Sequence, residues 1–132
     1  MSVKNNTRTK IGIVMATKLE ASPFIANMSM SLQEKKPFNL YTNSEIILII
    51  SGIGKSNSAM AVSYLVNKHD IKTFINTGAA GSTMDNLKIA DVLQINRIIE
   101  LDRINIMNNK PVEYQLDTLE LFENAALATQ DK

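Results

Sequence analysis

The stretch Ile46-Ile-Leu-Ile-Ile-Ser51-Gly-Ile-Gly-Lys-Ser56 decides the fold class of this chain. Ile46 to Ser51 is a run of strand length, rich in isoleucine and without alternation, which is typical of a strand covered on both faces. Ser56 to His69 has the length and apolar content of a helix with a wide buried face, and Thr73 to Asn76 predicts a second strand. Strand, helix, strand is the order of a crossover unit, so the sequence predicts an α/β fold with a mixed, largely parallel sheet and helices on both faces.

Further elements are predicted on both sides of this unit. Apolar runs predict two more strands at Ile11 to Ala16 and Val92 to Ile99. Phe38 to Thr42 alternates weakly and is predicted to pair with Ile46 to Ile50 as a hairpin, through a turn at Asn43 and Ser44. Two helices are also predicted: Thr17 to Ala26, entered through Thr17, and Gln115 to Ala128, amphipathic and following Pro111.

Length and composition describe a folded domain. The chain has 132 residues, of which 45% are hydrophobic and 20% charged, and these values exclude a disordered tail, a collagen-like fibre and a coiled coil. We expect a frayed N-terminus over residues 1–9 and a single domain over residues 10–132. No apolar segment is long enough for a signal peptide or a membrane helix, which predicts a cytoplasmic protein.

Charge and residue usage also limit the possible partners. Fourteen basic and thirteen acidic side chains leave a formal charge of +1 without a block of like charge, so neither nucleic acid nor a membrane surface is an expected partner. The absence of cysteine excludes disulfides and thiolate metal sites, and one histidine cannot build a multi-histidine site, so we expect no metal. His69 lies near the C-terminal end of its predicted helix, where a cation is favoured, which predicts a surface capping role.

Three predicted strands end in loops that could bind a ligand, because the carboxyl ends of strands are the binding edge of open α/β sheets. These loops are Met15 to Glu20, Ser51 to Ser56 and Thr77 to Ser82. In the second loop, Gly52 and Gly54 allow tight turns and close approach of backbone amides, but Ile49 stands where a phosphate-binding loop needs glycine. A simple tight turn is therefore the competing interpretation of this loop.

The third loop, Asn76-Thr-Gly78-Ala-Ala-Gly-Ser82, strings together small residues after a buried strand. It offers either a flat platform for a ligand or a turn beneath a packed neighbour. In the first loop, Glu20 is the only carboxylate between Lys10 and Gln33. It could act as a general acid or base, or it could be a solvated glutamate in a first helical turn, where the helix dipole favours it.

Four segments taken together resemble the first half of the nucleoside phosphorylase superfamily, and within it the methylthioadenosine/S-adenosylhomocysteine nucleosidases. The resemblance covers roughly residues 10 to 102 and implies a curved, phosphorylase/hydrolase-like sheet in truncated form. The segments are Lys10-Ile-Gly-Ile-Val-Met-Ala-Thr-Lys-Leu-Glu20, Ser51-Gly-Ile-Gly-Lys55, Ile75-Asn-Thr-Gly-Ala-Ala-Gly81 and Lys88-Ile-Ala-Asp-Val92.

The resemblance implies a role for individual residues. Glu20 matches the catalytic glutamate that activates water, and Ile53 matches the residue packed on the 5′ substituent of the nucleoside. Ala79, Ala80 and Gly81 match the backbone that lies against purine and ribose, with Gly52, Gly54 and Gly78 shaping the loops. The loop Ala16-Thr-Lys-Leu-Glu20 lacks the glycine and arginine with which bacterial phosphorylases hold phosphate, so hydrolysis is favoured over phosphorolysis.

The implied function is hydrolysis of the N-glycosidic bond of purine nucleosides, as in methionine salvage, with no cofactor. The second half of such an enzyme supplies the acid and the ribose-binding residues, and Arg103 to Lys132 resembles neither motif. We therefore expect activity that is incomplete without more protein, from a homo-oligomer or a complementing second chain. The alternative is an inactive truncated relative that binds nucleosides weakly or serves as an interaction module.

Overall fold

The computed structural model describes residues 10–119 and 121–131, so the predicted frayed N-terminus lies outside the described residues. Contacts within the chain gather in two units, residues 1–80 and residues 81–132. Each unit is described by itself below. The single domain expected over residues 10–132 stays a prediction.

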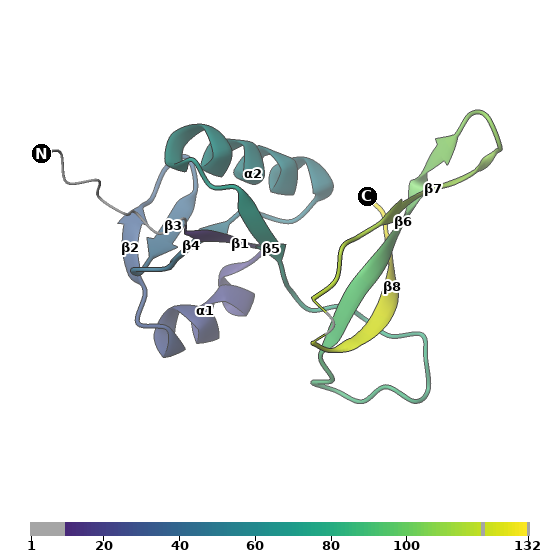
Figure 1. The fold of residues 1–132 in the computed structure, drawn as a ribbon, viewed down its shortest axis with the longest axis horizontal. Coiled ribbons are helices and arrows are strands. Elements are labelled where there is room, and N and C mark those ends of the chain that lie inside the picture. The colour runs from purple at the N-terminus through teal and green to yellow at the C-terminus, as the bar shows by residue number, and fades with distance from the viewer. Residues whose placement is uncertain (1–9, 120, 132) are drawn as a thin grey trace, which may run out of the picture. The chain divides into compact units, whose positions relative to one another are not determined.

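The first unit is built around a mixed five-stranded sheet (Figure 1). The strand order is β2-β3-β4-β1-β5, in which β1 runs parallel to β4 and β5 while β2, β3 and β4 pair antiparallel. The elements of this unit are β1 (Ile11–Met15), α1 (Lys18–Asn27), β2 (Ser31–Glu34), β3 (Asn39–Thr42), β4 (Ile46–Ile50), α2 (Lys55–His69) and β5 (Thr73–Asn76).

The predicted strands and hairpin of the first unit are confirmed. β3 and β4 form the hairpin, and its turn is held by Asn43, whose Oδ1 accepts hydrogen bonds from the N–H groups of Glu45 and Ile46 at 3.0 and 2.9 Å. Such a bond from an Asx side chain to the following backbone is the reason asparagine favours turns. β2 was not expected, because its sequence Ser-Leu-Gln-Glu has no apolar run or alternation.

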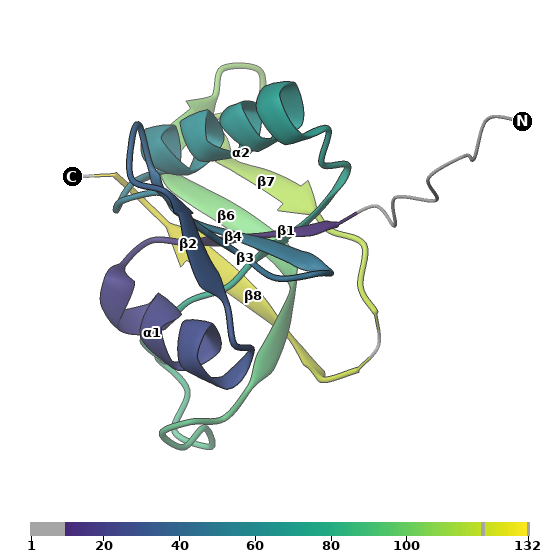
Figure 2. The same cartoon turned by 90° about the vertical axis from the view of Figure 1, so that its left-hand side faces the viewer.

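The two helices cover opposite faces of the sheet (Figure 2). Alternate strand residues point to opposite faces, so Val14 and Ile49 pack in a cluster with Leu65 of α2. Met15 and Leu48 instead pack in a second cluster with Ala21 of α1. This arrangement confirms the predicted α/β class with a mixed sheet and helices on both faces.

Helix α2 buries a narrower face than its apolar content predicts. Only Ala61 and Leu65 of this helix are buried. The side chains of Met60 and Val66 are 55% and 46% exposed, so the expectation of a wide buried face is wrong. The helix covers one side of a five-stranded sheet, and a single helix turns only part of its surface toward such a sheet.

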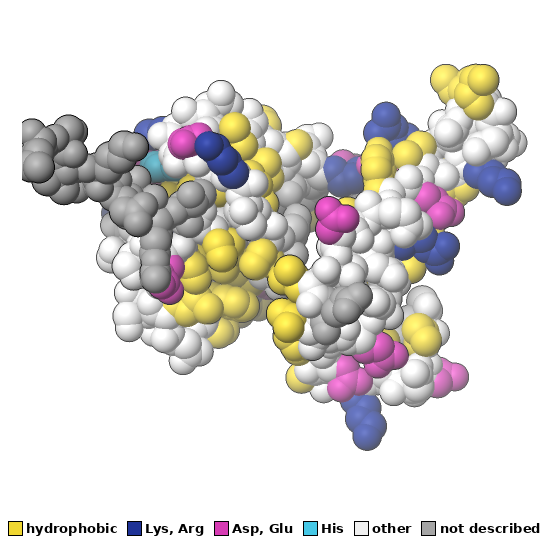
Figure 3. Space-filling view, in the orientation of Figure 1, with side chains coloured by type: hydrophobic (Ala, Val, Ile, Leu, Met, Phe, Trp, Pro, Cys, Tyr) yellow, Lys and Arg dark blue, Asp and Glu magenta, His cyan; other side chains and the backbone are white. Residues whose placement is uncertain are grey.

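The second unit is a three-stranded sheet of β6 (Leu93–Asn105), β7 (Lys110–Gln115) and β8 (Glu123–Thr129), in the order β7-β6-β8. β6 pairs antiparallel with β7 and parallel with β8. The strand expected at Val92 to Ile99 is present and continues to Asn105. The hairpin between β6 and β7 carries apolar side chains at its tip, where Ile106 and Met107 are 96% and 93% exposed (Figure 3).

The helix predicted for Gln115 to Ala128 is wrong. Gln115 is the last residue of β7, and Glu123–Thr129 is strand β8. The sequence Glu-Asn-Ala-Ala-Leu-Ala-Thr has helical propensity, but its backbone pairs with β6 over Leu93 to Glu100. Pairing with a neighbouring strand outweighs local propensity here. Among the described residues, no helix is long and apolar enough to cross a membrane.

Candidate active site

The parallel strands β4, β1 and β5 are neighbours, so their carboxyl ends lie at one edge of the first unit's sheet. Backbone hydrogen bonds connect the loops after β4 and β5 to β1 and to the residue that follows it. The Gly52 N–H donates to the Ala16 carbonyl at 3.0 Å, and the Thr77 N–H donates to the Val14 carbonyl at 3.2 Å. Three segments far apart in sequence are thereby held at the edge where ligands bind in open α/β sheets.

Glu20 lies in the first turn of α1, and the N-terminus of this helix fixes its carboxylate. Thr17 is the N-cap residue, and its side chain accepts a hydrogen bond from the Glu20 N–H. In return, the N–H and the hydroxyl of Thr17 donate to Glu20 Oε2 at 2.9 and 2.7 Å. This reciprocal arrangement is a capping box, which satisfies donors that the first turn of a helix leaves without partners.

The other carboxylate oxygen of Glu20 reaches the loop after β5. The Ala79 N–H donates to Glu20 Oε1 at 3.0 Å. A Cβ placed on Gly78 would lie 2.8 Å from the same oxygen, closer than carbon and oxygen atoms pack without a bond. Glycine at position 78 is therefore what allows the carboxylate to approach this loop.

These contacts keep Glu20 ionised. The hydrogen bond from the Ala79 amide, followed by that from the Thr17 hydroxyl, lowers the pKa of Glu20 below its ordinary value, and partial burial opposes them less strongly. At neutral pH the group is a carboxylate, which accepts protons and cannot donate one. Of the two chemical roles predicted for Glu20, the geometry supports the general base.

The loop after β4 takes its shape from two glycines with positive φ. Gly52 has φ +87°, and Gly54, the N-cap residue of α2, has φ +109°. Asn57 braces the loop, because its Nδ2 donates to the Ile53 carbonyl at 2.7 Å. The side chain of Ile53 itself is 77% exposed, so it is available to a ligand at this edge of the sheet.

The structure brings together some of the predicted site residues and leaves others unconnected. Glu20 and Ala79 are in direct contact, and Ala80 follows them as an exposed residue. Gly81 is the first residue of the second unit, and a Cβ on it would meet nothing within 4 Å. Thr17 was predicted only as a helix entry, although the pattern Thr-x-x-Glu at residues 17–20 is itself the signature of a capping box.

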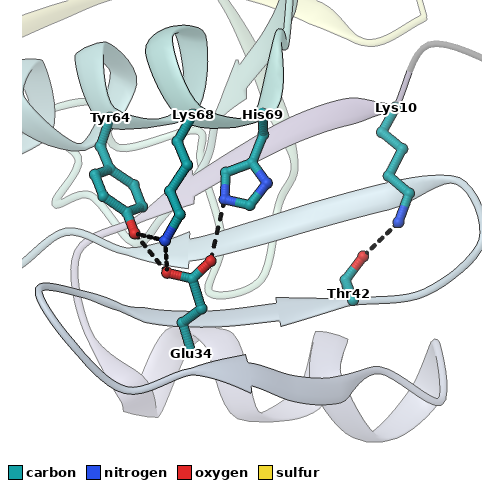
Figure 4. Close-up of polar contacts among 6 residues, drawn as sticks. All are labelled: Lys10, Glu34, Thr42, Tyr64, Lys68 and His69. Atoms are coloured by element: carbon teal, nitrogen blue, oxygen red, sulfur yellow. Dashed lines mark hydrogen bonds and ion pairs between the residues drawn. The ribbon is translucent and has the colours of Figure 1, made fainter.

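His69 has a different environment from the one predicted. Its side chain is only 13% exposed, and its Nε2 lies 3.3 Å from Glu34 Oε1 (Figure 4). The surface capping role is therefore wrong. Glu34 ends the edge strand β2 and also accepts hydrogen bonds from Lys68 at 2.7 Å and from the Tyr64 hydroxyl at 2.5 Å. This cluster joins the edge strand to α2 and belongs to the framework of the first unit.

Comparison with known proteins shows the family to which this chain belongs. A model of the phosphorylase superfamily matches residues 10–129, which is most of the chain. The chain belongs to the phosphorylase superfamily. The resemblance drawn from the loops of the sequence is confirmed.

This chain is similar to curated bacterial nucleosidases over part of their length. The 5′-methylthioadenosine/S-adenosylhomocysteine nucleosidase of Staphylococcus haemolyticus is 30% identical over 83 residues, which are 57% of this chain and 36% of that enzyme. The enzyme of the same name from Staphylococcus aureus is 34% identical over 89 residues, which are 63% of this chain and 39% of that enzyme.

Solved structures extend the likeness to almost the whole chain. The S-adenosylhomocysteine nucleosidase of Streptococcus pyogenes, in complex with 5-methylthiotubericidin, is 28% identical with a TM-score of 0.75 over 97% of this chain and 65% of that one. The futalosine hydrolase of Helicobacter pylori has a TM-score of 0.77 over 96% of this chain and 65% of that one, at 19% identity, which shows the fold alone. The chain thus spans less than two thirds of the length of these relatives.

Proposed function

We propose that this chain carries the general-base side of a nucleosidase site and hydrolyses the N-glycosidic bond of purine nucleosides such as 5′-methylthioadenosine. The observation that carries the proposal is the Glu20 carboxylate, held ionised at the binding edge of the sheet and in contact with the loop after β5. The similarity to curated nucleosidases supports the class of substrate.

The proposed reaction needs a base on the face of the sugar opposite the purine. A water proton passes to Glu20 as the water oxygen bonds to the anomeric carbon. The glycosidic C–N bond breaks through an oxocarbenium-like transition state, and its electron pair leaves with the purine, which takes up a proton. The products are the free purine and the 5′-substituted ribose.

The surrounding loops are suited to bind the rest of the nucleoside. In this proposal the exposed Ile53 packs on the 5′ substituent, and the backbone of Ala79, Ala80 and Gly81 lies against purine and ribose. The small side chains of these three residues allow a flat ring to approach the backbone closely. Gly78 serves the site indirectly, since it gives the Glu20 carboxylate room beside Ala79.

The proton for the leaving purine must come from another group. Glu20 is ionised and acts in this proposal on the opposite face of the sugar, so it has no proton to give to the purine. A positioned general acid contributes about 10²–10⁴-fold to a rate, so we expect this chain alone to be slower than an enzyme that has both groups by about that factor. A partner copy or further protein that supplies the acid would raise the rate.

The test is release of adenine from 5′-methylthioadenosine by the purified chain. Glu20→Gln is the informative variant, because glutamine also serves in a capping box and the helix is expected to persist without the base. Glu113→Gln is the control for loss of a carboxylate in the second unit. Release that is lost in Glu20→Gln and kept in Glu113→Gln would support the proposal. If the unsubstituted chain released adenine no faster than Glu20→Gln, the proposal would be contradicted.

A further inference from the structure

The two oxygens of the Glu20 carboxylate have different numbers of donors. Oε2 accepts two hydrogen bonds, both from Thr17, one from the backbone N–H and one from the hydroxyl. Among the described residues, Oε1 accepts one, from the Ala79 N–H. An ionised carboxylate has about four acceptor positions, two on each oxygen. Oε2 is therefore fully occupied, and Oε1 has one position left.

We infer that Thr17 is a positioning residue that occupies Oε2 and makes Oε1 the oxygen that takes the proton from the attacking water. The inference rests on the proposed function and adds the atom at which the base acts. A proton arriving on Oε2 would oppose two donors that already point at it, whereas Oε1 has an open position beside Ala79. Proton transfer thus takes the direction that keeps both Thr17 hydrogen bonds.

The hydroxyl of Thr17 has a fixed direction. It accepts a hydrogen bond from the Glu20 N–H at 3.3 Å and donates its single proton to Glu20 Oε2 at 2.7 Å. Threonine is β-branched, which restricts rotation about χ1 more than in serine. One hydroxyl therefore caps α1 and orients the carboxylate at the same time.

The backbone hydrogen bonds hold the carboxylate only in part. The Thr17 N–H binds the same oxygen as the hydroxyl, and the Ala79 N–H binds the other one. Without the hydroxyl, Oε2 would have a free acceptor position like that of Oε1, and the two oxygens would become equivalent toward water. The hydroxyl is thus the group that makes the carboxylate asymmetric.

Three variants separate positioning from capping. Thr17→Ser keeps the hydroxyl, and Thr17→Val removes it with little change in shape. Thr17→Gly also removes it, but glycine is tolerated at an N-cap nearly as well as threonine, so the helix is expected to remain folded. Ser22→Ala is the matched control, because it deletes an exposed hydroxyl of the same helix that donates to the Lys18 carbonyl and does not contact Glu20.

Two measurements on the full chain read the outcome. The first is a carbon-13 NMR titration of the Glu20 carboxyl, in which Thr17→Val and Thr17→Gly should raise its pKa while Thr17→Ser and Ser22→Ala should not. The second is the pH profile of adenine release. In Thr17→Val and Thr17→Gly we expect the acid limb of this profile to move to higher pH and kcat to fall about tenfold. KM should change less than about twofold, because the carboxylate is misoriented while the nucleoside contacts stay.

Each outcome is decisive for one of the two proposals. A Glu20 titration in Thr17→Val and Thr17→Gly that matches the unsubstituted chain would overturn the positioning role, whatever the activity. A titration that shifts as expected, in a chain whose adenine release does not depend on Glu20, would support the orientation of the carboxylate and contradict the proposed function. Normal kcat in Thr17→Gly together with a shifted titration would overturn the assignment of Oε1.

Discussion

Replacing Gly78 by alanine is the sharpest structural test of the contact between Glu20 and the loop after β5. The new Cβ would lie 2.8 Å from Glu20 Oε1 and 3.5 Å from its Cδ. Of the glycines, only Gly52 and Gly54 have positive φ, so alanine at position 78 meets no backbone strain. The effect of the substitution should therefore come from the clash with the carboxylate.

The size of the effect follows from the hydrogen bond that the clash breaks. Turning the carboxylate away from the new methyl group removes the bond from the Ala79 N–H. Hydrogen bonds to charged groups contribute about 1.5–3 kcal/mol when buried, and water can replace part of this one, so we expect a loss of about 1 kcal/mol in the free energy of unfolding. The pKa of Glu20 should also rise, because the Ala79 bond is the largest cause of its lowering.

The pH dependence of this loss has a definite sign. A carboxyl group whose pKa is lowered on folding contributes stability above its ordinary value of 4.5, and this stability is lost as the pH falls through the folded pKa. The difference between Gly78→Ala and the unsubstituted chain should therefore be full near pH 7. It should shrink as the pH falls through the lowered folded pKa of Glu20, below which both proteins carry a protonated Glu20.

Urea unfolding at about pH 7 and about pH 3, with the carbon-13 titration of Glu20, would measure both effects. The matched control is Gly81→Ala, because a Cβ there meets nothing within 4 Å and the residue has no positive φ. If Gly78→Ala and Gly81→Ala gave the same stability and the same Glu20 pKa, the close approach of the carboxylate to this loop would be refuted.

Three further predictions test the framework of the first unit. Leu65→Ala, at a side chain with 0% exposure, should lower the free energy of unfolding by about 2–5 kcal/mol in urea titrations, whereas Met60→Ala on the exposed side of the same helix should cost about 1 kcal/mol or less. Glu34→Gln should flatten the loss of stability on the acid side of pH 4.5, because hydrogen bonds from Lys68 and then from a tyrosine hydroxyl lower the pKa of Glu34; an unchanged acid limb would contradict this. Asn43→Ala should cost about 1 kcal/mol in the same assay, through loss of the turn before β4.

The parallel core was predictable because the sequences of its strands are uninterrupted apolar runs. β1 and β4 are buried on both faces, so Ile11 to Ala16 and Ile46 to Ser51 needed no tertiary information. Helix α2 was equally predictable, with a glycine loop before it and mostly apolar residues between Ala59 and Val66. In these segments the local pattern and the final packing favour the same structure.

Segments whose structure depends on distant partners were not predictable. β8 is rich in alanine and reads locally as a helix, but its neighbour β6 determines its backbone. The position of His69 predicts a cation at a helix end, but in the structure His69 lies beside Glu34 in a polar cluster. Glu34 belongs to an edge strand that has no recognisable hydrophobic pattern. Both errors have one physical origin, since the deciding partner lies far away in sequence and carries no local signal.

Glu20 shows how a helix-end position and contact with a distant loop can coincide in one residue. The sequence offered a glutamate in a first helical turn and a catalytic carboxylate as alternatives; in the structure Glu20 lies in the first turn, and the capping box fixes the carboxylate that reaches the Ala79 loop. The capping box could be predicted from the pattern Thr-x-x-Glu, because its partners are three residues apart. The contact with Ala79 could not be predicted, because Ala79 is 59 residues from Glu20. The Thr17 hydroxyl both accepts from the Glu20 N–H and donates to the Glu20 carboxylate, so one residue at the end of α1 contributes to the helix cap and to the lowered pKa of Glu20.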